Sequence, residues 1–387
     1  MSYAAPLEEM RFVLDRLAGL PEIAALPGFE DAQPDVVEAI LTEAARFASE
    51  VLAPLNATGD RQGCRWEGGR VTTPDGFPLA YRQFVDAGWH AMPVSSAIGG
   101  QGMPALLSSA VAEMWKSANL AFSLCQMLTI GAVEALAHHA SDELKARFLP
   151  KMVAGEWTGT MNLTESQAGS DLSTVRTRAE PDGENYRLFG SKIFITWGEH
   201  DVAENIIHLV LARLPDAPVG TRGISLFVAP KFLVAPDGSL GVRNDLSCVS
   251  IEHKLGIHAS PTAIISYGDK EGAIAYLVGE RAHRLGVRLH VHEHAPHIRM
   301  MDDRCPLAAA DRPALQAGAC VGDGLLVGRL RDGHALKAHI QPGVVHHGEH
   351  VFQAAVRLAD EVGDRALLIA IGHDGSGGGV YAQLVFD

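Results

Sequence analysis

The sequence contains few cysteines, no excess of basic residues and no long apolar run. Its five cysteines are too widely spaced for a disulfide framework or a CxxC metal site: Cys64, Cys125, Cys248, Cys305 and Cys320. The 32 lysines and arginines are outnumbered by 46 aspartates and glutamates, which gives a net charge of −14. Proteins that bind nucleic-acid phosphates carry the opposite balance, so we expect no nucleic-acid partner.

Signals for membrane insertion and secretion are also missing. No stretch approaches the roughly 20 apolar residues needed to cross a bilayer. The sequence MSYAAPLEEMR has no basic segment followed by an apolar core, so it does not resemble a signal peptide. With 47% hydrophobic and 20% charged residues, the composition is that of a globular protein. These features predict a cytoplasmic protein with reduced thiols, no membrane span and two or three domains.

The first part of the chain has the apolar periodicity of helices. From Pro34 to Leu52, apolar residues recur at the i, i+3 and i+4 spacing of a half-buried helix, and Pro54 lies just beyond its end. Ser141 precedes two acidic residues and can cap a further helix. We expect helices over residues 34–52, 80–87, 104–118, 119–139 and 141–153.

After Gly155 the pattern changes to short runs of β-branched and aromatic residues separated by turn sequences. We expect strands over residues 158–163, 174–179, 186–189, 192–196, 205–214, 223–229, 248–252 and 263–267. This spacing is typical of an antiparallel barrel or sandwich of about 120 residues. No Gly-x-Gly-x-x-Gly sequence follows a strand and opens a helix here, so a Rossmann dinucleotide site is not supported.

Two segments of the β-rich region are the most specific sequences in the chain. They are MNLTESQAGSDL at residues 161–172 and GSKIFITWG at residues 190–198. Further segments of the same kind are GGQGMP at 99–104 and IEHKLGIHASPT at 251–262. Singly, each fragment could be an ordinary strand or turn. Together, in this order and spacing, they resemble the flavin-dependent acyl-CoA dehydrogenase family, and most closely its long-form branch, which includes the 3-methylmercaptopropionyl-CoA dehydrogenases.

The residue types in these segments suit a flavin. An isoalloxazine ring needs a flat apolar wall and a few hydroxyl or amide groups directed at its polar edge. In a strand, Met161 and Leu163 share one face and oppose Asn162 and Thr164. Asn162 itself departs from the family pattern, in which a small residue or cysteine is common.

The resemblance implies specific roles for several side chains. Thr164 and Thr196 are expected to hydrogen-bond FAD near its reactive end, and Phe194 and Trp197 to flank the ring. Ser170 is expected to contact the acyl-CoA. The predicted cofactor-binding residues are Met161, Leu163, Thr164, Ser170, Phe194, Ile195, Thr196 and Trp197.

The resemblance also implies the reaction, which is the α,β-dehydrogenation of an acyl-CoA thioester. A carboxylate removes the α-proton, the β-hydrogen leaves as hydride to flavin N5, and hydrogen bonds polarise the thioester carbonyl. In the family, the base is a glutamate on a C-terminal helical bundle, and an electron-transfer flavoprotein receives the electrons. We find no such glutamate segment here, so no catalytic residue is assigned. We expect the family's homo-oligomer contacts to be lost with the bundle.

Residues 281–387 differ from the rest of the chain. They hold eleven of the 18 histidines and a single lysine, Lys337. The family's bundle helices are not recognisable in them, although Val380–Phe386 has the pattern of a strand. Residues 284–294 are codon-compatible, one base over, with a sequence that resembles the opening bundle helix of the family, and residues 281–283 with a continuation of Gly279-Glu280. We therefore hypothesise a frameshift near codon 281, although a single shift fails at Met300-Met301.

A metal site is the other interpretation of this histidine-rich region. The candidate ligands alternate along a strand or follow helical spacing: His290, His292, His294, His346, His347 and His350. No His-Glu-x-x-His motif or carboxylate at fixed spacing accompanies them. We therefore expect no metal site.

These observations predict an α+β multi-domain fold. An N-terminal extension (1–35) precedes an all-α domain (36–156), an antiparallel β-barrel for flavin and acyl-CoA (157–280) and an irregular tail (281–387). The predicted function is FAD-dependent acyl-CoA dehydrogenation, impaired in this chain. The alternatives are an inactive flavin- or acyl-CoA-binding remnant and a histidine-rich metal-binding protein.

Overall fold

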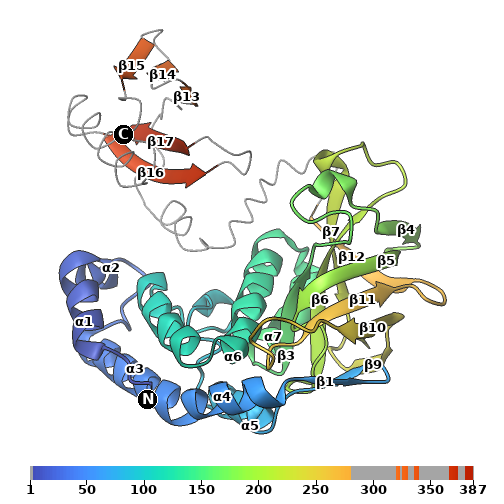
Figure 1. Ribbon diagram of the computed structural model, residues 1–387, viewed down its shortest axis with the longest axis horizontal. Helices are drawn as coiled ribbons and strands as arrows, with labels where there is room; N and C mark the ends of the chain where they lie inside the picture. Colours follow the sequence, from blue (N-terminus) through green and yellow to red (C-terminus); the bar gives the residue numbers. More distant parts are fainter. Residues whose placement is uncertain are drawn as a thin grey trace. The chain divides into compact units, whose positions relative to one another are not determined.

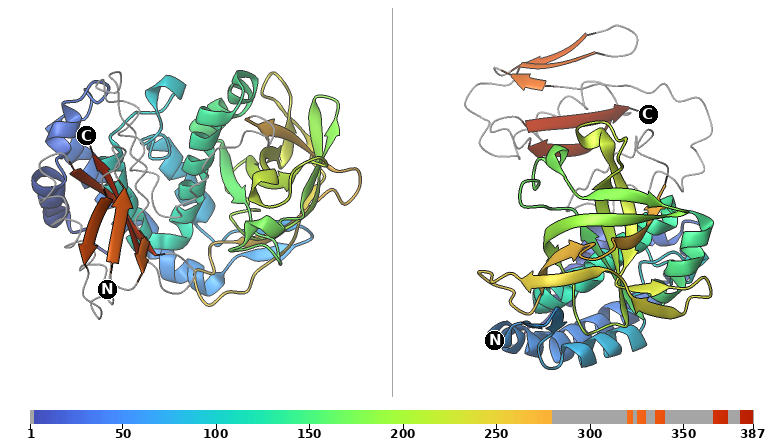
Figure 2. Two further views of the ribbon diagram at one scale, coloured as in Figure 1. Left: turned by 90° about the horizontal axis from the view of Figure 1, so that it is seen from above. Right: turned by 90° about the vertical axis from the view of Figure 1, so that its right-hand side faces the viewer.

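The computed structural model describes residues 3–279 and, in the C-terminal region, the backbone of five strands (Figures 1 and 2). The chain divides into two compact units, Met1–Met300 and Met301–Asp387. In the second unit, antiparallel pairs join β13 (Cys320–Gly322), β14 (Leu325–Arg329) and β15 (Ala335–His339), and also β16 (Ala366–His373) and β17 (Val380–Phe386). The tail expected to be irregular thus contains strands. Both predicted histidine clusters and the segment of the frameshift hypothesis lie outside the described residues.

The N-terminal region is helical, as predicted (Figure 1). The Ser141 hydroxyl accepts a hydrogen bond from the Leu144 N–H at 3.3 Å and caps the last helix. The helices are α1 (Leu7–Phe12), α2 (Leu20–Ala24), α3 (Pro34–Phe47), α4 (Ala53–Gln62), α5 (Phe77–Asp86), α6 (Ala105–His139) and α7 (Asp142–Val153), with π-helical segments at Val13–Leu17 and Ala48–Leu52.

The expected helix end before Pro54 is wrong. The chain stays helical from α3 through the wide turn Ala48–Leu52 into α4. The wide turn leaves Pro54 in the first turn of α4, where a residue without an N–H is tolerated. A proline therefore divides this helix into segments without stopping it.

The two helices predicted on either side of residue 119 form one element, α6, with a kink at their boundary. Asn119 has a non-helical backbone, with φ −157° and ψ 88°. Its buried side chain donates to the Leu52 carbonyl at 3.1 Å and accepts from the Phe122 N–H at 3.1 Å. The amide side chain thus caps the second half of α6 and ties the kink to the π-helical segment Ala48–Leu52.

Among the described residues, α6 is also long and apolar enough to cross a membrane, with a mean hydropathy of 1.6 over an 18-residue window. This corrects the expectation that no such run exists. Half of that window is buried inside the protein. Gln126 on α6 donates to the His90 carbonyl at 2.9 Å, a contact made within the helical region. The apolarity of α6 is explained by its place in the core.

The β-rich half of the first unit is a closed sheet. In pairing order, β10, β11, β5, β12, β7, β6 and β3 lie side by side, and β4 joins β5 to β6. The pairings β5–β12–β7–β6–β4–β5 therefore form a ring, which confirms a barrel. The strands are β3 (Trp157–Asn162), β4 (Arg178–Asp182), β5 (Asn185–Thr196), β6 (Asn205–Arg213), β7 (Ile224–Pro230), β10 (Leu246–Ile251), β11 (Thr262–Tyr267) and β12 (Ala273–Val278).

The barrel is not antiparallel throughout, contrary to expectation. β3 runs parallel to β6, because the connection between them contains β4 and β5 and is long enough to return the chain in the same direction. The sequence also predicted a break at Gly190, but β5 continues through it. A Cβ at this position would lie 2.9 Å from Thr177 Cα, so glycine here permits a close approach of two chain segments.

Short strands not predicted from the sequence lie beside this barrel. β1 (Arg65–Glu67) pairs with β2 (Arg70–Thr72), and β8 (Phe232–Val234) pairs with β9 (Leu240–Arg243). One apolar core lies within the helices, one lies between α6, α7 and the barrel, and one fills the barrel. The barrel is thereby fixed against the helices over the strand β3, which leads into the candidate site.

Candidate functional site

The two most specific sequence segments meet where β3 ends. β5 carries a bulge here, because Ile193 and Phe194 together oppose the single residue Ile264 of β11. Phe194 has a positive φ of 59°, which is rare for an aromatic residue. The extra N–H of the bulge, that of Ile193, donates to the Thr164 carbonyl at 2.9 Å. The bulge therefore docks the segment after β3 onto β5.

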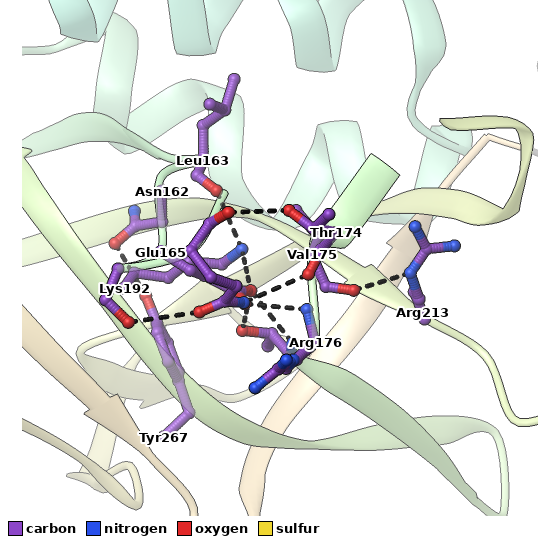
Figure 3. A network of polar contacts seen from close by, with 12 residues as sticks. Asn162, Leu163, Glu165, Thr174, Val175, Arg176, Lys192, Arg213 and Tyr267 are labelled. Carbon is purple, nitrogen blue, oxygen red and sulfur yellow. Dashed lines mark hydrogen bonds and ion pairs between the residues drawn. The ribbon is translucent and has the colours of Figure 1, made fainter. Parts of the chain in front are cut away.

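A buried ion pair reinforces this contact (Figure 3). The Lys192 ammonium donates to Glu165 Oε1 at 2.8 Å and to the Leu163 carbonyl at 3.0 Å. The two side chains are only 0% and 5% exposed. Burial alone would raise the pKa of Glu165, but hydrogen bonds from Lys192 and Thr177 outweigh it and lower that pKa to about 2. The Glu165 carboxylate is therefore charged at neutral pH.

The same carboxylate also holds the far end of the loop at residues 166–175. It accepts hydrogen bonds from the Arg176 N–H at 2.8 Å, the Thr177 N–H at 3.0 Å and the Thr177 hydroxyl at 2.6 Å. On the opposite side, the Arg213 guanidinium donates to the Val175 carbonyl at 2.7 Å (Figure 3). Both ends of this loop are thus fixed to the barrel by charged groups.

Two predicted hydroxyl groups remain free beside this network. Within residues 3–279, the half-buried hydroxyls of Thr164 and Thr196 have no protein partner. Phe194 is 57% exposed, and Met161 and Leu163 are half-buried at the edge of the core between barrel and helices. The arrangement therefore combines free hydroxyls with apolar surface.

Two other predicted residues lie inside cores. Ile195 is 1% exposed and packs in the barrel interior. Trp197 is also 1% exposed and packs in the helical core, where its indole N–H donates to the Ala121 carbonyl at 3.0 Å. Trp197 has a positive φ of 54°, a strained conformation that turns the chain from the barrel towards the helices. These two side chains anchor Thr196 from either side.

Comparison with known proteins supports the resemblance seen in the sequence. Residues 34–156 match the acyl-CoA dehydrogenase N-terminal domain, and residues 160–269 match the middle domain. The chain belongs to the acyl-CoA dehydrogenase family. Its 3-methylmercaptopropionyl-CoA dehydrogenase relative from Ruegeria pomeroyi is 50% identical over 281 residues, which cover 72% of this chain and 47% of the relative. A butyryl-CoA dehydrogenase from Syntrophomonas wolfei is 37% identical over 285 residues, again 72% and 47%.

The chain spans about half the length of these curated relatives. Solved structures show the same fold. Butyryl-CoA dehydrogenase from Megasphaera elsdenii matches 65% of this chain with 60% of its own, at a TM-score of 0.51 and 23% identity. An acyl-CoA dehydrogenase from Bacillus anthracis, complexed with FAD, matches 67% of this chain with 39% of its own, at a TM-score of 0.51 and 21% identity.

The residues of this chain fit the FAD on which the acyl-CoA dehydrogenase family depends. The free hydroxyls of Thr164 and Thr196 are the polar groups that such a ring requires, and Phe194 supplies an exposed flat apolar side chain. At Gly169, a Cβ would meet nothing closer than Thr164 Cγ2 at 3.9 Å, so the backbone is open to a ligand. The donor set and the apolar surface thus occur together.

Asn162, which departs from the family pattern, belongs to a buried polar group behind the site. Its Oδ1 accepts from the Tyr267 hydroxyl at 2.8 Å and lies 3.3 Å from His208 Nδ1. The His208 Nε2 is buried and has no hydrogen-bond partner among residues 3–279. Burial, followed by the charges of Lys231 and Arg243, lowers the pKa of His208 to about 3. A neutral His208 therefore matches an amide at position 162.

Sequence reasoning did not identify Lys192 and Thr177 as parts of the site. A lysine in a strand normally faces solvent, so its type argues against burial. The available signal was position alone, because Lys192 and Glu165 lie in the two most specific segments of the sequence. The backbone groups that Glu165 holds could not be inferred without the loop geometry.

Proposed function

We propose that residues 34–269 form the FAD- and acyl-CoA-binding part of an enzyme that α,β-dehydrogenates an acyl thioester. The observation that carries this proposal is the pair of free hydroxyls on Thr164 and Thr196 beside the exposed Phe194, in the region that matches the middle domain of the family. FAD, when bound, supplies the hydride acceptor.

Each residue has a role set by its position. The hydroxyls of Thr164 and Thr196 hydrogen-bond the polar edge of the flavin, and Phe194, with Met161 and Leu163, excludes water from it. Ser170, which is exposed on the loop at 166–175, contacts acyl-CoA in this proposal.

Ile195 and Trp197 act differently from the other predicted flavin residues. Because both side chains lie in cores, they hold Thr196 in place and do not present a surface to a ring. Their role in the proposed site is to fix the direction of the Thr196 side chain.

Glu165 cannot serve as the catalytic base, although it is the carboxylate of this segment. A general base works best when its pKa lies near the working pH, and the contacts of Glu165 lower its pKa to about 2. All of its hydrogen-bonding capacity is also engaged by the loop and Lys192. We therefore assign no base to residues 3–279.

A second candidate is a protein that binds flavin and acyl-CoA without turnover. It is favoured by the extent of the family match, which ends at residue 269, and by the frameshift hypothesis for the segment beyond 281. In the active form, an electron-transfer flavoprotein would accept the electrons. Homo-oligomerisation would depend on an intact C-terminal bundle.

Flavin binding and reduction by substrate test these proposals separately. The purified full chain is titrated with FAD and followed by flavin fluorescence, and then mixed anaerobically with butyryl-CoA or 3-methylmercaptopropionyl-CoA. We expect FAD to bind without loss of its yellow colour on addition of substrate. Bleaching would support an active dehydrogenase and contradict impairment, and a chain that binds no FAD would overturn the proposed site. Thr164→Val with Thr196→Val should weaken FAD binding about tenfold, because two hydrogen bonds are lost.

A further inference from the structure

The buried pair Glu165–Lys192 has no part in the chemistry proposed above, yet it connects the parts of the site. We propose that this pair is a positioning device, which sets the place of the Thr164 hydroxyl and of the loop at residues 166–175 for flavin binding. This inference rests on the proposed function. In this inference, the ion pair affects ligand binding indirectly, through Thr164 and the loop.

The first step is that β5 fixes three consecutive residues, Leu163 to Glu165. Lys192 holds the Leu163 carbonyl and the Glu165 carboxylate, and the bulge N–H of Ile193 holds the Thr164 carbonyl between them. A residue held on its own carbonyl and on both neighbours has little freedom to rotate. The position of the backbone that carries the free Thr164 hydroxyl is thus set by Lys192 and the bulge.

The second step is the closure of the loop. The Glu165 carboxylate bonds the N–H groups of Arg176 and Thr177, which follow the loop, and the Gln167 amide at 2.6 Å, which begins it. Glu165 therefore bonds both ends of the segment that carries Ser170, alongside the Thr174 hydroxyl and the Gln167 amide, which donate to the Gln167 and Thr174 carbonyls at 2.8 and 3.2 Å. Loss of its charge weakens the hydrogen bonds that it accepts at both ends.

The third step concerns the chemical type of the side chain. Four donors besides Gln167 converge on Glu165: the Lys192 ammonium, the Thr177 hydroxyl and the N–H groups of residues 176 and 177. A carboxylate offers acceptors only, and a glutamine in its place would direct an NH₂ group against one of these donors. It would also leave the Lys192 charge buried without a partner. A glutamate, and no amide, satisfies this set.

The experiment compares Glu165→Gln with a matched carboxylate in the same barrel. Asp245 holds its own loop by accepting from the N–H groups of Lys270, Glu271 and Gly272 at 2.9, 2.8 and 3.0 Å. It lies next to the Leu246↔Tyr267 end of β11, whereas Thr196 pairs with Thr262 at the other end. Asp245→Asn therefore weakens a carboxylate-held loop away from the free hydroxyls.

We expect Glu165→Gln to weaken FAD binding to the full chain about tenfold or more, and to shift the visible spectrum of the bound flavin. Asp245→Asn should leave both unchanged. Thr177→Val, which removes one hydroxyl and keeps the ion pair, should act in the same direction by about threefold, and it serves if Glu165→Gln does not fold.

Each contrary result has a distinct meaning. Wild-type affinity and spectrum in Glu165→Gln, or in Thr177→Val if only that variant folds, would overturn the positioning role while the flavin site stands. An equal loss in Asp245→Asn would also overturn it, because the effect would be one of general stability. Failure of the unmodified chain to bind FAD would instead overturn the proposed function.

Discussion

Two glutamates are buried in this barrel, and they use their charge in different ways. Glu165 and Glu199 are 5% and 2% exposed. Glu165 has one cationic partner, Lys192, and otherwise bonds to backbone N–H groups, a hydroxyl and an amide. Glu199 pairs with two cations, Lys231 and, at 2.9 Å, Arg243.

The difference follows from what each glutamate connects. Glu199 links side chains of segments that are already ordered by strand pairing, from the end of β7 to β9. Glu165 orders a loop that has little regular pairing of its own. An ion pair between strands stabilises existing structure, whereas a carboxylate that bonds backbone N–H groups determines the path of the chain. The free hydroxyls lie beside Glu165, which is the carboxylate that bonds backbone N–H groups.

Loss of Lys192 should produce the largest effect. In Lys192→Met, the Glu165 charge stays buried without its cation, and the Leu163 carbonyl loses a donor. We expect the free energy of unfolding to fall by about 3 kcal/mol or more, measured by urea unfolding with tryptophan fluorescence. A loss no greater than that of the corresponding Lys231 variant would contradict the distinction between the two glutamates.

Loss of Lys231 should be less severe. In Lys231→Met, Glu199 keeps Arg243 as a partner, so its charge remains compensated. We expect a decrease of about 1–2 kcal/mol in the free energy of unfolding. A double-mutant cycle with Arg243→Met checks the reason, because the second substitution should cost more in the Lys231→Met background than alone. Simple additivity would show that the two cations act independently.

The fold was largely predictable because it depends on local periodicity. The helix boundary at Asn119 and the cap at Ser141 were both placed from the sequence, whereas the kink, which is tied to a carbonyl 67 residues away in the chain, was not. The parallel pairing of β3 with β6 was missed, because strand direction depends on where residues 163–204 return in space. The helix end predicted before Pro54 was wrong for a related reason, because the residue type of Pro54 does not indicate the wide turn that precedes it.

The candidate site was predictable only in part. Thr164 and Thr196 were found through the family pattern, and their hydroxyls are free in the described residues. The contribution of Lys192 was missed, because its value comes from a carbonyl and a carboxylate that the bulge at Phe194 brings within reach. Trp197 was predicted to flank the flavin because its side chain is aromatic. In the structure, this side chain is buried in the helical core.

His208 is linked to both glutamate networks, to one by a contact and to the other by its cations. Its ring contacts Asn162, next to the Glu165 segment, while burial and then the cations Lys231 and Arg243 lower its pKa to about 3. The unfolded chain has a histidine pKa of about 6.5. Between these values the unfolded state binds a proton that the folded state does not. The contribution of neutral His208 to the free energy of unfolding is therefore fully present above about pH 6.5 and is lost as the pH falls towards 3.

A further expected effect is the loss of this pH dependence in His208→Gln. Between pH 6 and 4 its free energy of unfolding should fall less steeply than that of the unmodified chain, by about 1.4 kcal/mol per pH unit. At pH 8, where histidine is neutral in both states, the two chains should differ by a constant that reflects only the changed contacts. Urea unfolding across this range measures both. Parallel pH profiles would show that His208 takes up its proton in the folded barrel, and that burial and the cations Lys231 and Arg243 do not keep it neutral.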